Sequence, residues 1–151
     1  MRNSKGFGLL ELMVTLVVAA LLTALAVPAY DGFVQRARVA RAIGDISTIA
    51  LEIEKFRLQN DVLPPPSLDD LPGQVPMDPW DRPYQYVQIQ GAGGGVGGFR
   101  KDGSLNPINT DYDLYSSGKD GDSSGPLNAA KSRDDIVRAN NGAFIGRAED
   151  Y

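Results

Sequence analysis

Five carboxylates are the residues best placed to do chemistry in this chain. Glu11 is the single charged residue between Phe7 and Ala29, and four aspartates gather in the C-terminal third, namely Asp120, Asp122, Asp134 and Asp135. The chain has no histidine and no cysteine, which removes the commonest general base, thiolate chemistry and disulfides. Oxygen ligands favour calcium or magnesium. With no pair of nucleophile and base to assemble, we expect no enzyme.

The segment around Glu11 is long and apolar enough to cross a bilayer as one helix, which takes about 20 residues. Two interpretations follow from this composition. A secretory signal peptide would be cleaved after Ala24-Leu25-Ala26, and a plain membrane anchor would stay in place. Neither gives a reason for Glu11, because a carboxylate within a membrane helix is costly and by default has a functional partner.

The run K-G-F-G-L-L-E-L, from Lys5 to Leu12, resembles the cleavage and assembly signature of type IV prepilins. The resemblance implies that a prepilin peptidase cuts on the cytoplasmic side after Gly6 and that the new amine of Phe7 is methylated. It also implies that Glu11 directs assembly. The carboxylate of one subunit would pair with the Phe7 amine of its neighbour, which would fix the register between subunits in a filament.

The same helix is expected to bend near its exit from the membrane. Pro28 removes one helical hydrogen bond and clashes with the carbonyl of Ala24, and Gly32 follows closely. The pair predicts a kink and is a candidate for melting when a filament forms. A kink at the membrane surface with no functional role is the alternative.

Beyond Tyr30 the pattern becomes amphipathic. Apolar residues recur at helical intervals of three and four, at Val39, Ile43, Ile46, Ile49, Ile53 and Phe56. This stripe predicts the face on which a globular head packs, and the helix should end near Asn60, ahead of three prolines. The expected organisation is a leader at 1–6, a transmembrane and assembly helix at 7–30, its amphipathic half at 31–60, and a head at 61–151.

The head is expected to contain a small antiparallel sheet. Strand formers alternate from Tyr84 to Ile89 and again from Thr110 to Ser116, and a short strand is expected at Phe99-Arg100 between them. The segment from Ser116 to Gly146 is expected to be a long loop. Covering the helix stripe with this sheet gives an α+β, pilin-like fold.

Two motifs in the head, D-P-W-D-R-P-Y-Q-Y from Asp78 and Y-D-L-Y-S-S-G-K-D-G from Tyr112, resemble the major (G-type) pseudopilin of type II secretion systems. The chain departs from that pattern at Asp81, where glycine is usual, and at Lys119. It also continues past Asp134-Asp135-Ile136, which matches the usual end of the family.

In that family the loop after the last strand binds calcium through aspartates and backbone carbonyls. The resemblance therefore implies a Ca2+ site in which Asp120 and Asp135 match the family positions, with Asp122 and Asp134 beside them. A solvated acidic turn is the alternative.

The implied function is that of a structural subunit of a secretion pseudopilus, which polymerises with itself to drive export of folded proteins from the periplasm. The implied partners are the prepilin peptidase, an inner-membrane assembly platform, minor pseudopilins and, before assembly, membrane lipid. The chain would be a single-pass protein of the bacterial inner membrane with a periplasmic head. A type IV pilus subunit is the alternative. A net charge of -4 and a pI of about 4.7 argue against a nucleic-acid partner.

Overall fold

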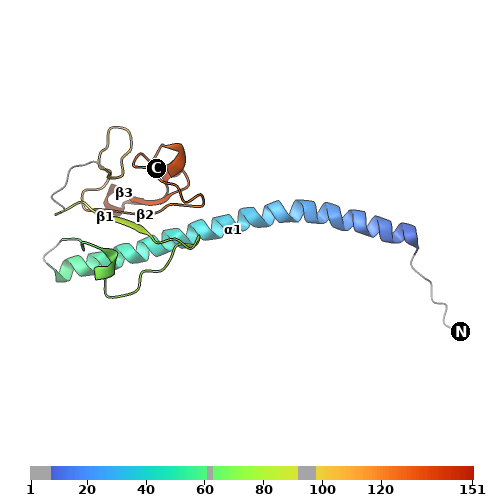
Figure 1. Cartoon of the computed structure of the whole chain (residues 1–151), viewed down its shortest axis with the longest axis horizontal. Helices are drawn as coiled ribbons and strands as arrows, with labels where there is room; N and C mark the ends of the chain where they lie inside the picture. Colours follow the sequence, from blue (N-terminus) through green and yellow to red (C-terminus); the bar gives the residue numbers. More distant parts are fainter. Residues whose placement is uncertain (1–7, 61–62, 92–97) are drawn as a thin grey trace. The chain divides into compact units, whose positions relative to one another are not determined.

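The computed structural model describes residues 8–60, 63–91 and 98–151 of the chain. The chain divides into two compact units, one that ends at Ala37 and one that starts at Arg38. The described residues of the first unit form the N-terminal part of a long helix, and the second unit contains the rest of that helix and the head (Figure 1).

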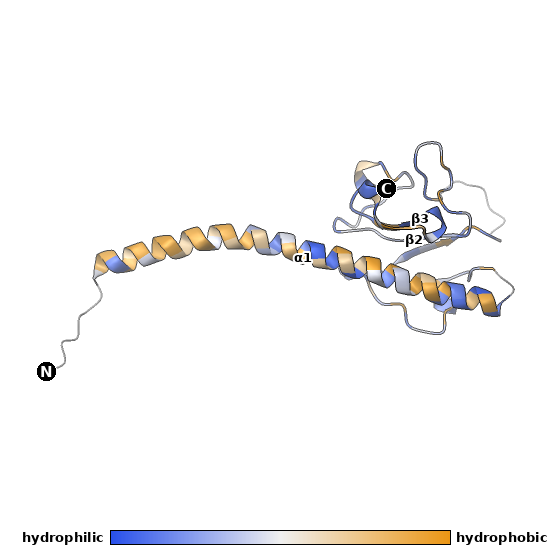
Figure 2. Ribbon diagram, turned by 180° about the vertical axis from the view of Figure 1, so that it is seen from behind, coloured by the Kyte–Doolittle hydropathy of each residue, from blue (hydrophilic) through white to orange (hydrophobic). Residues whose placement is uncertain are grey.

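The long helix, α1, spans Leu9–Gln59. Its N-terminal part is mainly apolar, apart from Glu11 in the first turn, whereas charged and apolar residues are mixed along its C-terminal part (Figure 2). By length and composition α1 is able to cross a membrane. It ends where the sequence predicts, and the side-chain amide of Asn60 donates to the carbonyl of Phe56 at 3.0 Å, which satisfies one carbonyl of the last turn.

The described part of the chain forms a four-stranded antiparallel sheet in the order β1-β2-β3-β4. The strands are β1 (Gln85–Gln88), β2 (Tyr112–Ser116), β3 (Ile136–Ala139) and β4 (Phe144–Arg147). Four short 3-10 helices accompany them, η1 (Leu68–Asp70), η2 (Ala130–Ser132), η3 (Asn140–Gly142) and η4 (Ala148–Asp150). The α+β fold with a long helix and a small antiparallel sheet is confirmed.

The sheet differs from expectation in its C-terminal half. The strands expected around Tyr84 and Tyr112 are present, but Phe99 and Arg100, which the structure describes, belong to no strand. The predicted loop from Ser116 to Gly146 was wrong in its second part, because β3 and most of β4 lie within it. The connection between β2 and β3 is therefore the segment 117–135.

The core lies on both faces of the sheet. On one face, Tyr112, Leu114 and Ile136 pack against the stripe of α1, whose buried members are Ala42, Ile46, Ile49 and Ile53 (Figure 1). On the other face, Val137 and Ala139 pack with residues of the C-terminal loops. Because successive strand residues point to opposite faces, β3 contributes to both cores.

Candidate functional site

Glu11 is an exposed carboxylate in the first turn of α1. Its backbone amide donates to Gly8 O at 3.0 Å, and the Thr15 hydroxyl donates back to Glu11 O at 3.0 Å. Large apolar side chains surround it on the helix surface, and Leu10 is 77% exposed. A negative charge at this end of a helix is favourable because the helix dipole is positive there. Gly6 and Phe7, the predicted cleavage and methylation positions, lie outside the described residues.

The predicted bend positions lie within a continuous helix. Pro28 is inside α1, and the helical assignment runs through it and through Gly32. A Cβ atom added to Gly32 would meet only Arg36, at an ordinary 3.7 Å. Close packing therefore does not require glycine at this position, and the kink and its melting stay predictions.

The motif that begins at Asp78 is a turn tied to the end of β2. Asp78 is buried, and its Oδ1 accepts from the amides of Trp80 at 3.0 Å and Arg82 at 2.9 Å. Its Oδ2 accepts from the Ser116 hydroxyl at 2.6 Å. Asp81 has φ 63, a left-handed conformation that glycine adopts freely and aspartate tolerates. This conformation explains why glycine is usual at this position and why aspartate can replace it.

The start of the β2–β3 connection is held by a second residue of this turn. Arg82 Nη2 donates to the carbonyl of Gly118 and, at 3.2 Å, to that of Lys119. Gly118 and Gly121 both have positive φ, and a Cβ on either would collide, with Asp134 in the first case and with the Arg82 guanidinium in the second. Both glycines are therefore needed for the close approach of Arg82 and Asp134 to this loop.

Three of the four predicted metal ligands are engaged separately. Asp134 Oδ2 accepts from the backbone amides of Lys119 at 2.7 Å and Asp120 at 3.0 Å, which closes the loop on itself. Asp120 Oδ1 accepts from the amide of Asp122 at 2.8 Å. The Asp122 carboxylate pairs with Lys131 at 3.1 Å at the surface.

The fourth, Asp135, is fully buried beside an arginine. Its Oδ2 lies 2.6 Å from Arg100 Nη2 and 2.6 Å from the Ser123 hydroxyl. Burial raises the pKa of the Asp135 carboxyl, and the hydrogen bond from Ser123 and the charge of Arg100 oppose that rise. The pair is nearly inaccessible to water, with side chains 3% and 0% exposed.

These positions do not fit a shared calcium ion. No group of three or more acidic side chains in the described ranges is arranged to hold a metal. Asp122 is paired with Lys131 and Asp135 with Arg100, and each cation supplies the positive charge that calcium would bring. The structure therefore does not bring Asp120, Asp122, Asp134 and Asp135 together, and calcium stays a prediction of the resemblance.

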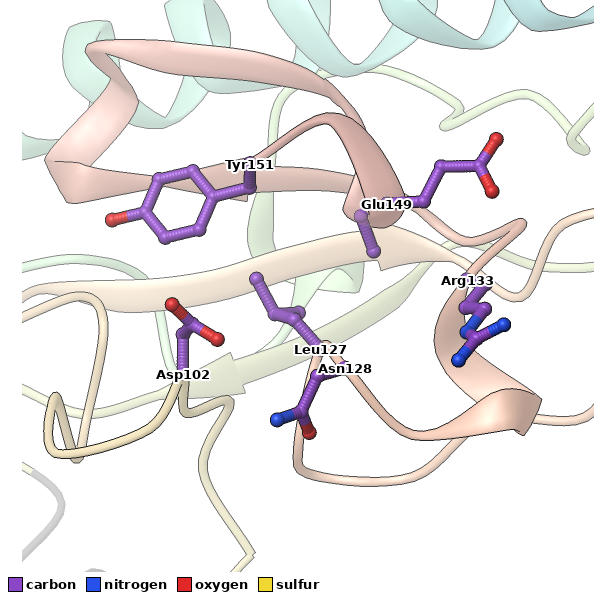
Figure 3. A pocket seen from close by; sticks show the side chains of 7 residues that line it. Asp102, Leu127, Asn128, Arg133, Glu149 and Tyr151 are labelled. Atoms are coloured by element: carbon purple, nitrogen blue, oxygen red, sulfur yellow. The ribbon is translucent and has the colours of Figure 1, made fainter.

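A separate cavity of about 360 Å³ lies near the C-terminus. Figure 3 shows six of the side chains that line it, Asp102, Leu127, Asn128, Arg133, Glu149 and Tyr151. The lining mixes acidic, basic, amide and apolar groups, and it includes none of the four aspartates predicted as ligands. The cavity therefore does not include the predicted metal ligands, although Leu127, Asn128 and Arg133 belong to the same β2–β3 connection.

Two arginines that organise the loop were missed by reasoning from the sequence. Arg82 lies in a motif that the resemblance singles out, but the motif does not show which carbonyls it binds. Arg100 follows a glycine-rich stretch, and nothing in its surroundings along the chain points to Asp135, from which it is separated by 35 residues. The Arg100 amide is bonded to Asp113 of β2, and Asp135 directly precedes β3, so the pairing of β2 with β3 helps to bring the two residues together.

Two of the similarities to known proteins cover only part of this chain. The family described as Prokaryotic N-terminal methylation motif matches residues 1–27. A fimbrial protein of Pseudomonas aeruginosa is 34% identical over 59 residues, which cover 39% of this chain and 38% of that protein. No solved structure gives a significant match. The similarity to the fimbrial protein therefore leaves most of the chain uncovered.

Similarity to secretion proteins extends over most of the chain. The type II secretion system core protein G of Pseudomonas aeruginosa is 32% identical over 149 residues, covering 85% of this chain and 93% of that protein. The core protein G of Klebsiella pneumoniae is 28% identical to this chain, and the match covers 90% of this chain and 94% of that protein. On this length and identity, the chain belongs to the family of type II secretion system core protein G, the major pseudopilins.

Proposed function

We propose that this chain is the structural subunit of a type II secretion pseudopilus and that it polymerises through α1 to drive export of folded proteins from the periplasm. The observation that carries the proposal is Glu11, an exposed carboxylate in the first turn of an apolar helix. It stands four residues after Phe7, the residue that prepilin cleavage would make N-terminal.

The exposed apolar surface of α1 supports two successive environments. Before assembly, lipid would cover side chains such as Leu10, Leu16 and Leu25, which are 77%, 70% and 74% exposed in the single chain. The proposal places the chain in the bacterial inner membrane as a single-pass protein with a periplasmic head. After assembly, the same side chains would pack against the helices of neighbouring copies. The prepilin peptidase, an assembly platform and minor pseudopilins are the partners this sequence of events needs.

The pairing of Glu11 with a neighbour's amine would supply direction and register. Side-chain packing between apolar helices tolerates sliding, whereas an ion pair in a water-poor bundle is strongly position-dependent. A subunit that enters out of register would leave both charges unpaired. Glu11 therefore acts as an assembly residue and has no catalytic part.

A type IV pilus is the second candidate, favoured by the fimbrial relative that matches 39% of the chain. The head argues for secretion, because similarity to the core protein G of Pseudomonas aeruginosa and of Klebsiella pneumoniae covers 85% and 90% of this chain. Expression in a strain that lacks its own core protein G distinguishes the two. Restored export of secreted proteins is expected, and surface pili with no restored export would favour the alternative.

Glu11→Gln tests the assembly role within the proposed function. The full chain is co-expressed with a prepilin peptidase and an assembly system, and filament yield is measured after shearing. We expect processing before Phe7 with methylation, seen by intact mass, and loss of most filaments in the variant. The amide keeps the size of the side chain but removes the charge that the neighbouring amine needs.

Glu52→Gln is the matched control, because Glu52 lies at the surface of the amphipathic half of α1 and pairs with Lys55. It should assemble normally. Fluorescence of Trp80, the single tryptophan, reports whether the head of each variant is folded. Normal filament yield from Glu11→Gln, or a mature chain that starts at Val27, would contradict the proposal.

A further inference from the structure

We propose that the guanidinium of Arg100 closes the β2–β3 connection of this head and takes the place that a divalent cation would otherwise fill. The proposal goes beyond the assembly function, since it concerns what holds the head together. It rests on where one buried cation lies and on which oxygens surround it.

Arg100 is 2% exposed, and the two terminal nitrogens of its guanidinium contact oxygens of the connection, whereas its Nε has no hydrogen-bond partner among the described residues. Nη1 donates to the carbonyl of Ser124 at 2.6 Å, and Nη2 donates to the Ser123 hydroxyl and to Asp135 Oδ2, both at 2.6 Å. A carbonyl, a hydroxyl and a carboxylate are the ligand types that a hard cation takes. Here they converge on an arginine of the β1–β2 connection.

The guanidinium is held in place from its other sides. It lies over the ring of Tyr115 at 3.6 Å from the ring centre, a geometry in which the face of an aromatic ring attracts a cation. The Arg100 backbone is also fixed, because its amide donates to Asp113 Oδ2 at 2.7 Å and its carbonyl accepts from Ile108 at 2.9 Å. Contacts with β2, and with Ile108 in the residues that lead into β2, therefore hold the guanidinium in position.

The surrounding charges leave little reason for a second cation at this place. A divalent ion bound to Asp135 would sit next to a guanidinium only 2.6 Å from the same carboxylate, and two cations repel strongly in a buried site. Asp135 Oδ1 is buried without a hydrogen-bond partner among the described residues. A single free oxygen does not make a site for a divalent ion, however. The Asp134 carboxylate accepts from backbone amides and the Asp122 carboxylate pairs with Lys131, so neither is available as a further ligand.

The first test is a calcium titration of the full chain in detergent micelles, followed by thermal unfolding with Trp80 fluorescence as the signal. A site filled at about 100 times Kd would raise the unfolding midpoint by several degrees. We expect the same midpoint in chelator, in millimolar calcium and in millimolar magnesium. A midpoint that rises with calcium, together with one bound calcium per chain in equilibrium dialysis, would overturn the proposal.

The second test removes the guanidinium. Arg100→Met keeps most of the side-chain stem but leaves Asp135 buried and unpaired, so we expect the midpoint to fall by more than about 10 °C with or without calcium. Arg133→Met is the matched control, because Arg133 is an exposed arginine within the same connection, and it should leave the midpoint unchanged.

Arg100→Lys and the double variant Arg100→Met/Asp135→Asn keep the test decisive if Arg100→Met does not fold. Lysine retains the charge without the planar fork, so an intermediate midpoint is expected. The double variant removes both charges and should be more stable than Arg100→Met alone. Equal midpoints for Arg100→Met and Arg133→Met, or a double variant less stable than Arg100→Met, would contradict the role given to Arg100.

Discussion

Three tyrosines at the interface of sheet and helix differ in what their hydroxyls contact. The Tyr84 hydroxyl donates to Asp45 at 2.9 Å, and that of Tyr86 donates to the Pro65 carbonyl at 2.6 Å. Tyr112 is completely buried, its ring lies under the Arg138 guanidinium at 3.9 Å, and its hydroxyl finds no partner among the described residues. A buried hydroxyl without a partner carries a desolvation cost that a hydrogen-bonded one recovers.

Tyr112→Phe should therefore raise the free energy of unfolding by about 1 kcal/mol, since it removes the unpaired hydroxyl and keeps the ring. Tyr86→Phe, the matched control, should lower it by about 1 kcal/mol because it leaves the Pro65 carbonyl without its donor. Urea unfolding of the detergent-solubilised chain measures both. A loss of stability in Tyr112→Phe as large as that in Tyr86→Phe would show that the Tyr112 hydroxyl is satisfied.

The same three residues predict how stability depends on alkaline pH. Burial raises the pKa of Tyr112 to about 12 from the ordinary 10.0, and burial also raises the pKa values of Tyr84 and Tyr86. Between pH 10 and 12 the unfolded chain loses protons that the native chain keeps, so the free energy of unfolding falls as pH rises. Unfolding at stepped pH measures the slope, which should be shallower in Tyr112→Phe. A slope unaffected by that change would exclude Tyr112 as a source.

Some of the site could be foreseen residue by residue, and some could not. The motif could be compared with the family pattern, in which glycine stands at the position of Asp81. The φ of 63 at Asp81 is the left-handed conformation that glycine adopts freely. The spacing of Glu11 follows a local signature and is visible in sequence. The partners of Asp135 were not foreseeable, because a carboxylate predicted as a metal ligand and one predicted to pair with an arginine have the same appearance in a sequence.

At the scale of elements, the helical spacing of apolar residues predicted the buried face of α1, and the alternation of strand formers predicted β1 and β2. The stripe from Val39 to Phe56 marks the buried face of α1, and β1 and β2 lie where strand formers alternate. Strand β3 was missed because Arg138 interrupts a short apolar run. The structure buries that arginine and pairs it with Asp111 at 2.7 Å, and no pattern in a single strand predicts such a pair.

Strand β4 gives the C-terminal tail a structural role that its sequence did not suggest. The tail pairs with β3 from Ile136↔Arg147 to Ala139↔Phe144, so it covers an edge whose residues are buried. Truncation after Asn140 would expose that edge and part of the second core. We expect the unfolding midpoint of the head to fall by more than about 10 °C, or cooperative unfolding to be lost.

Tyr151→Ala is the control for this truncation. It removes the edge-to-face contact between the rings of Tyr151 and Phe144, whose centres are 5.2 Å apart, and should cost about 1 kcal/mol. Thermal unfolding followed by Trp80 fluorescence compares the two. A truncated chain that unfolds at the wild-type midpoint would show that β4 contributes little to the head.

At the scale of the whole molecule, the two units have different sources of stability. The second unit, from Arg38 onward, buries its own cores, whereas the part of α1 before it has its large apolar side chains exposed. The boundary predicted near Tyr30, where the composition changes, stays a prediction, and the two units meet at Ala37 and Arg38. The sequence could not predict how the head closes the β2–β3 connection, since that depends on contacts between segments far apart in the chain.

The order of the strands has a consequence for how the head is made. Each strand of the sheet pairs with the strand that precedes it in the chain. Synthesis starts at the N-terminus, so every new strand meets a preceding element that is already present. The first of these elements is the stripe of α1. Such vectorial addition avoids waiting for a distant segment, and it leaves the edge of β3 open to wrong partners only until β4 has been synthesised.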